Sequence, residues 1–365
     1  MDRLIVKNFG PLKDIDIELN QINLLIGENG SGKSVLAKLV TTILYIINFE
    51  DKELFYKKLT EFNINFIKDN SFIEYYKREK VIFELNKNNI SVNYIFSKIN
   101  PLHSNILKSS EEYVVSNIGK NENLINAIER GKKVLNKSYP QYIPAERNLI
   151  SLFNKSIYTL ILEEVPLPKF LLSFASEFEK AGNELKELEL LNVKYVNGNG
   201  LDRHKVYFDD KNYLPLEFSS SGIQSALPLY LTVKYFAQKH RSIIIEEPEQ
   251  NLFPKAQKET VEYIVEQLGK DNSLFMMTHS PYILTSLNNL ILANDIKNQK
   301  GLEAIKGIVK EKQCVAFEDV SAYMLVDGKS IDIMDKEDRI IGVNLIDSIS
   351  DEVNETFDKL LAKLD

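Results

Sequence analysis

One octapeptide near the N-terminus, GENGSGKS at residues 27–34, restricts the possible folds of this chain more than any other segment. It follows the apolar run INLLI and precedes SVLAKLVTTILYII, which is apolar enough to form a buried helix. Glycine lets the backbone curl so that several N–H groups point at one anion, and a helix N-terminus adds a positive dipole. The pattern therefore predicts a phosphate-binding loop between a central strand and a helix that begins near Lys33.

The side chains of this loop suit a nucleotide with a bound metal ion. Lys33 carries a mobile positive charge for the β and γ phosphates, and the hydroxyl of Ser34 is suited to ligate Mg²⁺. A chance glycine-rich turn is the alternative, and the strand and helix that flank the loop argue against it. The predicted nucleotide contacts are Asn29, Gly30, Ser31, Gly32, Lys33, Ser34 and Val35.

A second segment, SIIIEEPEQNLFP at residues 242–254, joins a buried strand to adjacent carboxylates. Three isoleucines predict a strand inside a sheet, whereas two ionised carboxylates at its end repel each other and are costly to desolvate. Glu246 lies where an acid holds Mg²⁺ in P-loop NTPases, and Glu247 is placed to accept a proton from an attacking water. Surface strands often end in two acids, but the phosphate loop upstream favours the functional interpretation.

Two further segments follow in an order that fits the first two. SSSGIQS at residues 219–225 opens a predicted helix, where hydroxyls, backbone N–H groups and the helix dipole can bind another phosphate. A cluster of N-cap serines is the ordinary alternative. Because the chain already has a phosphate loop, a second device suggests that one subunit caps the nucleotide of another. The residues assigned to this device are Ser221, Gly222 and Gln224.

His279 in MMTHSPYIL follows another apolar strand. A neutral imidazole at that place can hydrogen-bond a γ-phosphate oxygen and respond to its loss. A lone histidine at a strand end is more often a surface residue, but the serial position of this one favours a role in the site.

The bulk properties agree with a large globular protein. The 365 residues are 44% hydrophobic with a net charge of −7, so overall charge gives no support for non-specific nucleic-acid binding. A single cysteine, Cys314, excludes a disulfide within one chain and fits a reducing compartment. No signal peptide or membrane span is recognisable, so we expect a cytoplasmic protein without a membrane partner.

The two ends of the chain alternate strand and helix, while the middle is mostly helical. This predicts one α/β core formed by residues 1–50 and 200–365. A helical and β lobe at 51–199 is inserted into it, and residues 141–150 return to the core sheet. Four smaller predictions follow from periodicity and turn signals: an amphipathic helix at 176–191, a hairpin of VIFELN with ISVNYIF, a tail hairpin of CVAFE with SAYMLVDG, and a last helix at 345–364.

These elements, in this order, resemble the ABC-type ATPases, in particular the non-transporter branch that includes SMC, RecF and the OLD-family nucleases. By this resemblance GENGSGKS is similar to the Walker A motif and IIIEE to Walker B, and His279 corresponds to the switch histidine. SSGIQ is similar to the signature motif, with Ile223 in place of a glycine. The implied fold class is α/β, a P-loop NTPase with an ABC-ATPase head: a mixed sheet with flanking helices and a mostly helical inserted lobe.

The resemblance also implies a mechanism. ATP and Mg²⁺ bind at the Walker A loop, and Ser34 and Glu246 hold the metal ion. Two heads close face to face on ATP, so that each signature helix completes the other's site. Glu247, His279 and Lys33 then act in hydrolysis to ADP and phosphate. We therefore expect a homo-oligomer built from ATP-dependent dimers.

The loop after Walker B is expected to turn toward the dimer face and to be mobile without ATP. Glu249 and Asn251 are its candidates for contact with the partner subunit. A glutamine typical of the Q-loop is not evident in the chain, and Arg147 or Glu146 is a candidate for that region.

Finer features resemble the stand-alone ATPases of bacterial anti-phage systems, such as Septu, the retron-associated ATPases and PARIS. They are YIPAER at 142–147, EEPEQNLFP and THSPYIL. OLD nucleases continue into a domain with clustered acids, whereas the acids of the short tail here read as hairpin edges and turns. The resemblance therefore implies a sensor or scaffold for a separate effector, which we expect to be a nuclease.

Two other roles remain open at this point. The alternative is a DNA-repair ATPase of the RecF or SMC type that binds duplex DNA. Its basic candidates are YKREK at 76–80 and RGKK at 130–133, although each has the composition of an ordinary solvated face. A transporter motor fits less well, because THSPYIL and the N-terminal KNF strand are typical of the non-transporter branch.

Overall fold

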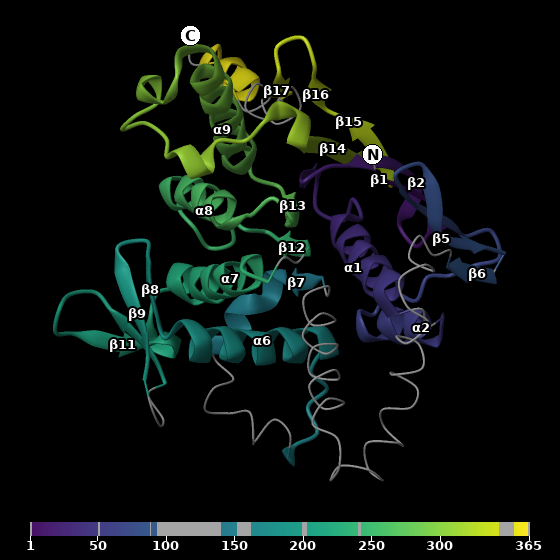
Figure 1. Ribbon diagram of the computed structural model, residues 1–365, viewed down its shortest axis with the longest axis horizontal. Coiled ribbons are helices and arrows are strands. Elements are labelled where there is room, and N and C mark those ends of the chain that lie inside the picture. Colours follow the sequence, from purple (N-terminus) through teal and green to yellow (C-terminus); the bar gives the residue numbers. More distant parts are fainter. Residues whose placement is uncertain are drawn as a thin grey trace, which may run out of the picture.

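The computed structural model describes residues 2–49, 52–87, 89–92, 140–151, 162–198, 203–239, 242–342 and 354–363. One mixed sheet of eleven strands organises this part of the chain (Figure 1). In spatial order its strands are β6 (Asn89–Val92), β5 (Lys80–Asn86), β4 (Phe72–Lys77), β1 (Asp2–Phe9), β2 (Leu12–Leu19), β15 (Lys329–Asp332), β14 (Val320–Val326), β3 (Ile22–Ile26), β13 (Ser273–Thr278), β12 (Ser242–Glu246) and β7 (Gln141–Ile143).

The half of the sheet that runs from β14 to β7 is parallel, and the half that contains β1, β2, β4, β5 and β6 is antiparallel. All five residues of β3 are buried, and Ile243, Ile244 and Ile245 of β12 have no exposed surface. Parallel strands covered on both faces require such continuous apolar runs. The three isoleucines therefore lie in a central strand, as the sequence predicted.

Helices cover both faces of the parallel half. In Figure 1, α1 and α2 lie on one side of β7, β12 and β13, and α7, α8 and α9 lie on the other. The helices are α1 (Lys33–Phe49), α2 (Lys52–Glu61), α6 (Lys169–Leu185), α7 (Ser221–Ala237), α8 (Pro254–Gln267) and α9 (Pro281–Lys300), with short 3₁₀ turns η1 (Ala145–Asn148), η2 (Leu216–Phe218), η3 (Leu302–Ala304), η4 (Glu311–Gln313) and η5 (Phe317–Asp319). Among the helices so described, none is both long and apolar enough to cross a membrane.

A second, antiparallel sheet packs beside α6. Its strands are β11 (Tyr213–Pro215), β10 (His204–Tyr207), β9 (Val193–Asn197) and β8 (Glu187–Leu190), in that order. The helix predicted at 176–191 is wrong at its C-terminal end, because α6 stops at Leu185 and Lys186 takes a φ of +59°. Beyond that point Glu187, Leu188, Glu189 and Leu190 alternate exposed and buried, and this period of two belongs to a strand.

The predicted tail hairpin has the wrong first arm. The hairpin is formed by β14 and β15, with Val326 paired to Lys329 across the turn residues Asp327 and Gly328. Both turn residues have positive φ, +50° and +77°, as a two-residue hairpin turn of the Asp-Gly type requires. A Cβ on Gly328 would lie 2.1 Å from the Pro11 carbonyl oxygen, so this turn also needs glycine for lack of space.

Two small strands, β16 (Met334–Asp335) and β17 (Ile340–Ile341), complete the described part. The predicted hairpin near residue 88 is confirmed where it is described, because β5 and β6 pair antiparallel. Of the predicted last helix, residues 354–361 are helical and 345–353 lie outside the described residues.

The division into a core and an inserted lobe stays a prediction, and much of the expected lobe, residues 93–139 included, lies outside the described residues. Within the described part, β4 pairs with β1, so the sheet continues without a break into residues 72–92. β7 pairs with β12 in parallel, which places residues 141–143 in the same sheet.

His204 lies buried between α6 and the second sheet. Its Nδ1 and the Tyr195 hydroxyl are 3.0 Å apart, and its ring lies 4.7 Å from that of Phe178. Burial, and next the positive charge of Arg203, lower the pKa of His204 to about 4. The imidazole of His204 therefore stays neutral in the folded state at pH values where it is protonated in the unfolded chain, whose histidine pKa is about 6.5.

Stability should therefore fall as the pH drops from about 6.5 towards 4, by up to about 3 kcal/mol from this group alone. Urea unfolding of the wild type and of His204→Gln at pH 7 and pH 4.5 measures the effect. Glutamine keeps a polar partner for Tyr195 and does not titrate, so the variant should lose less stability than the wild type. An identical pH dependence of the two proteins would contradict the assignment.

Candidate nucleotide-binding site

The candidate residues gather where three neighbouring parallel strands end. Thr278 at the end of β13 pairs with Ile26 of β3, and Met277 pairs with Glu246 at the end of β12. The loop after β3, the acids after β12 and the histidine after β13 therefore share one edge of the sheet. In parallel α/β sheets this carboxyl edge is where ligands bind.

The loop at 27–34 has the backbone of an anion cradle. Gly30 and Gly32 have φ values of +82° and +102°, which residues with a side chain rarely adopt. A Cβ on Gly27 would lie 2.6 Å from the Leu325 carbonyl oxygen, so β14 leaves no space for one. The predicted contacts Asn29, Gly30 and Ser34 are exposed, and Ser31 and Val35 are half-buried.

Lys33 begins α1, and its side chain curls back into the loop. Its Nζ donates hydrogen bonds to the carbonyl oxygens of Gly27, at 2.6 Å, and Glu28, at 2.8 Å. Burial lowers the pKa of Lys33, and the carboxylates of Glu247, Glu249 and Glu246 oppose that shift. The ammonium group thus lies inside the cradle, beside the acids, where a phosphate group can replace the two carbonyls.

Glu246 is 4% exposed, and its Oε1 has no hydrogen-bond partner among the described residues. Burial raises the pKa of Glu246, and the charge of Lys38 and the nearby hydroxyls of Tyr142 and Ser34 oppose the shift. A buried carboxylate oxygen without a partner is costly unless a ligand completes it. Glu246 and Ser34 together therefore fit a hard cation such as Mg²⁺, which prefers oxygen ligands.

Glu247 has a strained backbone, with a φ of +45°. Its N–H donates to the Met277 carbonyl, which ties the turn to β13. Its side chain is 35% exposed, and Oε1 lies 3.8 Å from Nδ1 of His279. The carboxylate is thus reachable by water and stands beside the histidine.

Glu249 is a third carboxylate at this edge. Its Oε1 accepts hydrogen bonds from the Thr278 hydroxyl, at 2.7 Å, and from the His279 N–H, at 3.0 Å, and lies 3.5 Å from Nδ1 of His279. The side chain is 5% exposed, so Glu249 faces inward in this chain, and its contact with a partner subunit stays a prediction. The Glu-Pro-Glu spacing was the available signal, because the turn brings both carboxylates to one imidazole.

The signature residues lie at the start of α7. Ser220 caps the helix by accepting from the Ile223 N–H, and Ser221 is exposed at its first position. Gln224 donates to the carbonyls of Glu217 and Ser219, so its amide holds the preceding turn. A Cβ on Gly222 would lie 3.1 Å from the Asn251 carbonyl oxygen.

Within the described part of the chain, no hydrogen bond or ion pair joins Ser221, Gly222 or Gln224 to the phosphate loop. The loop that follows β12 lies against α7 instead, since the Ser225 hydroxyl donates to Oε1 of Gln250 at 3.1 Å. Of the two Q-loop candidates, Glu146 is exposed and Arg147 is fully buried. A cradle, three carboxylates and one imidazole thus meet at one edge of the sheet.

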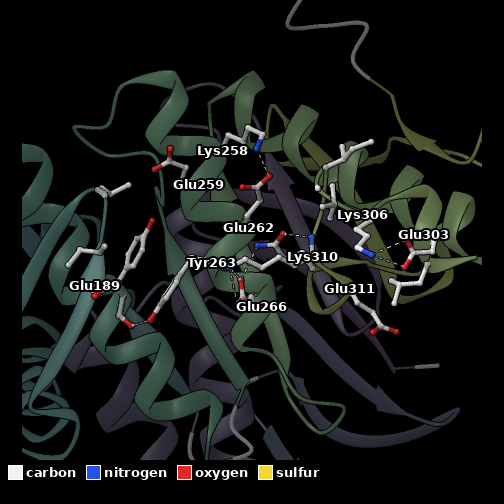
Figure 2. Close-up of a pocket in the computed structure, with 18 residues that line it drawn as sticks. Glu189, Lys258, Glu259, Glu262, Tyr263, Glu266, Glu303, Lys306, Lys310 and Glu311 are labelled. Atoms are coloured by element: carbon white, nitrogen blue, oxygen red, sulfur yellow. Dashed lines mark hydrogen bonds and ion pairs between the residues drawn. The ribbon is translucent and has the colours of Figure 1, made fainter.

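The hollow of about 700 Å³ drawn in Figure 2 lies elsewhere, between α8, the segment at 302–313 and the turn after β8. Its three lysines are each ion-paired with a glutamate of the same hollow: Lys258 with Glu262, Lys306 with Glu303, and Lys310 with Glu266. Because these lysines are neutralised and further glutamates line the hollow, it does not favour the binding of an anion such as a nucleotide phosphate. We therefore do not assign the nucleotide to this hollow.

A family model described as the AAA ATPase domain matches residues 48–284. This is well over half of the chain, and it includes α7, the acids after β12 and His279, but begins after the phosphate loop. No curated protein matches the chain at a significant level.

Several solved structures are similar to the chain in overall shape. An Smc head bound to the C-winged helix domain of ScpA has a TM-score of 0.42 at 14% identity, with 93% of this chain and 99% of that one covered. An Smc head with an extended coiled coil, from Pyrococcus furiosus, has a TM-score of 0.40 at 12% identity, with 97% of this chain and 100% of that one covered. RecF in complex with an ATP analogue has a TM-score of 0.38 at 13% identity, with 91% of this chain and 97% of that one covered.

Proposed function

Because this chain belongs to the AAA ATPase domain family, whose model matches residues 48–284, we propose that it binds ATP at residues 27–34 and hydrolyses it. The chain has the predicted fold, a P-loop NTPase of the ABC-ATPase type with a large mixed sheet and flanking helices. One observation carries the proposal: Lys33, Glu246, Glu247 and His279 converge at the carboxyl edge of three neighbouring parallel strands.

Each residue has a chemical task in this proposal. The loop N–H groups and Lys33 bind the β and γ phosphates, and Lys33 stabilises charge on the phosphoryl oxygens in the transition state. Glu247 orients a water and accepts its proton, while His279, held by Glu249, donates to the γ-phosphate. Ser34 and Glu246 would hold Mg²⁺, which supplies charge neutralisation to the phosphates when it is bound.

The second half of the site comes from another copy of the chain. The exposed N-terminus of α7, with Ser221 and Gly222, provides N–H groups and a helix dipole that suit a γ-phosphate. ATP then acts as a ligand that favours the closed dimer over the open monomer. Larger homo-oligomers are built from such dimers.

For the cellular role, we propose a cytoplasmic sensor or scaffold that controls a separate effector, a nuclease, in bacterial anti-phage defence. The resemblance of YIPAER and of the segment after β12 to stand-alone defence ATPases supports this role.

The alternative is a RecF- or SMC-like ATPase that binds duplex DNA, and the turn at 76–80 favours it. That turn exposes Lys77, Arg78 and Lys80 at the tip of the β4–β5 hairpin. The other basic candidate, residues 130–133, lies outside the described residues.

The wild-type protein tests the proposal directly. With ATP and Mg²⁺ we expect phosphate release and a doubling of the molar mass in light scattering, whereas ADP should leave the mass unchanged. Failure of ATP to bind, to dimerise the protein or to be hydrolysed would each remove the corresponding part of the proposal. Salt-dependent binding of duplex DNA by the ATP-bound protein would favour the DNA-repair role over the defence role.

A further inference from the structure

Arg147 in η1 is a fully buried arginine, and its hydrogen bonds within the described part of the chain all go to main-chain carbonyl oxygens. Its Nη1 reaches the carbonyl of Glu246 at 2.7 Å, and its Nη2 reaches that of Glu247 at 2.6 Å. Its Nε reaches the carbonyl of Ser225 at 3.0 Å, and Nη1 also contacts that of Pro144 at 3.1 Å. One side chain therefore joins three elements: the turn after β7, the end of β12 and the second turn of α7.

The guanidinium forms no salt bridge with a carboxylate among the described residues. Burial lowers the pKa of Arg147 to about 10, and the negative charges of Glu249 and Glu247 oppose that shift. The group therefore stays charged at neutral pH. Burying a charge that only carbonyl oxygens bind costs free energy, so stabilising the core does not explain Arg147. What the side chain does is fix the relative positions of the carbonyls that it binds.

That geometry bears on Glu247. The carbonyls of the peptide links before and after Glu247 are bound by one rigid, planar fork, and Glu247 between them has a φ of +45°. Strained backbone conformations persist only where the surroundings hold them. Arg147 supplies that restraint through its hydrogen bonds to the carbonyls of Glu246 and Glu247.

The same fork reaches α7, and a second link runs parallel to it. The Ser225 hydroxyl donates to Oε1 of Gln250, which lies three residues after Glu247. A Cβ on Gly222 of α7 would lie 3.1 Å from the Asn251 carbonyl oxygen, so α7 and the loop after β12 lie close together here. Two sets of hydrogen bonds therefore link α7 to the turn that carries Glu247.

We propose that Arg147 is a positioning residue that holds the carboxylate of Glu247 in its reactive place and couples it to α7. The inference rests on the proposed ATPase function with shared sites. In such a dimer, the nucleotide held in the phosphate loop of one copy contacts the N-terminus of α7 in the second copy. Through Arg147 of the second copy, this contact fixes the position of Glu247 in the second copy. The two sites of a dimer then hydrolyse ATP cooperatively.

The test compares Arg147→Lys with the wild type. Lysine keeps the charge but has a single ammonium group, which cannot span the three elements. We expect ATP affinity within about twofold of wild type, kcat lowered roughly 10- to 100-fold, and a Hill coefficient for ATP that falls from above 1 to about 1. Arg339→Lys, which changes an arginine bound to Asp295 and Glu318, is the matched control and should leave all three values unchanged.

Because Arg147 is buried, a thermal melt must show that the variant folds. If it does not, Gln250→Ala breaks the parallel link from the other end and should still lower the Hill coefficient towards 1. A wild-type kcat in Arg147→Lys overturns the positioning role, and equal losses of affinity and kcat with an unchanged Hill coefficient reduce it to a structural one. A wild type without hydrolysis would instead refute the proposed function.

Discussion

Glu247→Gln should bind ATP with wild-type affinity and hydrolyse it roughly 10²- to 10⁴-fold more slowly. Glutamine has nearly the shape of glutamate and keeps the turn after β12, whose contacts to Met277 and Arg147 are made by the main chain. It cannot accept the proton of the attacking water. The binding steps therefore remain and the chemical step is lost.

The variant should also accumulate as a closed dimer in ATP and Mg²⁺, because the γ-phosphate that joins the two copies is no longer removed. Phosphate release and molar mass by light scattering, measured on the same sample, check both parts. Glu337→Gln, at an exposed turn beyond β16, is the matched control. Turnover at the wild-type rate in Glu247→Gln would falsify the assignment of the base.

Lys33→Ala should lose nucleotide binding itself. The ammonium group of Lys33 lies within the loop on the carbonyls of Gly27 and Glu28, and the negative charges of Glu247, Glu249 and Glu246 act on it. Without it, phosphates would approach Glu246, Glu247 and Glu249 with no positive charge between them. Removing one partner of such a charged contact costs about 2 kcal/mol or more, so we expect ATP affinity to fall at least ~30-fold.

The measurement is the increase in melting temperature on adding ATP and Mg²⁺. This increase reports nucleotide affinity and does not depend on hydrolysis as its signal. The increase should vanish in Lys33→Ala and persist in both Glu247→Gln and the exposed control Lys336→Ala. A normal ATP-dependent increase in Lys33→Ala would show that the nucleotide binds elsewhere. The two site variants thus separate binding from chemistry.

The parts of this site that could be predicted from the sequence depend on local patterns. The loop at 27–34, the acids after β12 and His279 each follow an apolar strand, and strand ends are readable from the residues that flank them. Their meeting at one edge also follows, because parallel strands place their carboxyl ends together.

The parts that could not be predicted depend on contacts between distant segments. Nothing near Arg147 in the sequence indicates that its fork binds carbonyls of Ser225 and Glu247. The inward turn of Glu249 depends on Thr278, which the sequence places on another strand. The sequence predicts β8 as the end of an amphipathic helix, whereas Leu188 and Leu190 lie two residues apart on one face of a strand that pairs with β9.

The strand order described above has a consequence for biosynthesis. β3 leaves the ribosome early, but its two neighbours in the sheet, β13 and β14, are made late. Asn23 of β3 donates to the Leu274 carbonyl, 251 residues further along the chain. A nascent chain therefore cannot assemble the nucleotide cradle until nearly all of it has been translated. Such distant pairings fold slowly and expose apolar strands in the meantime. Incomplete chains should thus be inert towards ATP and should depend on chaperones.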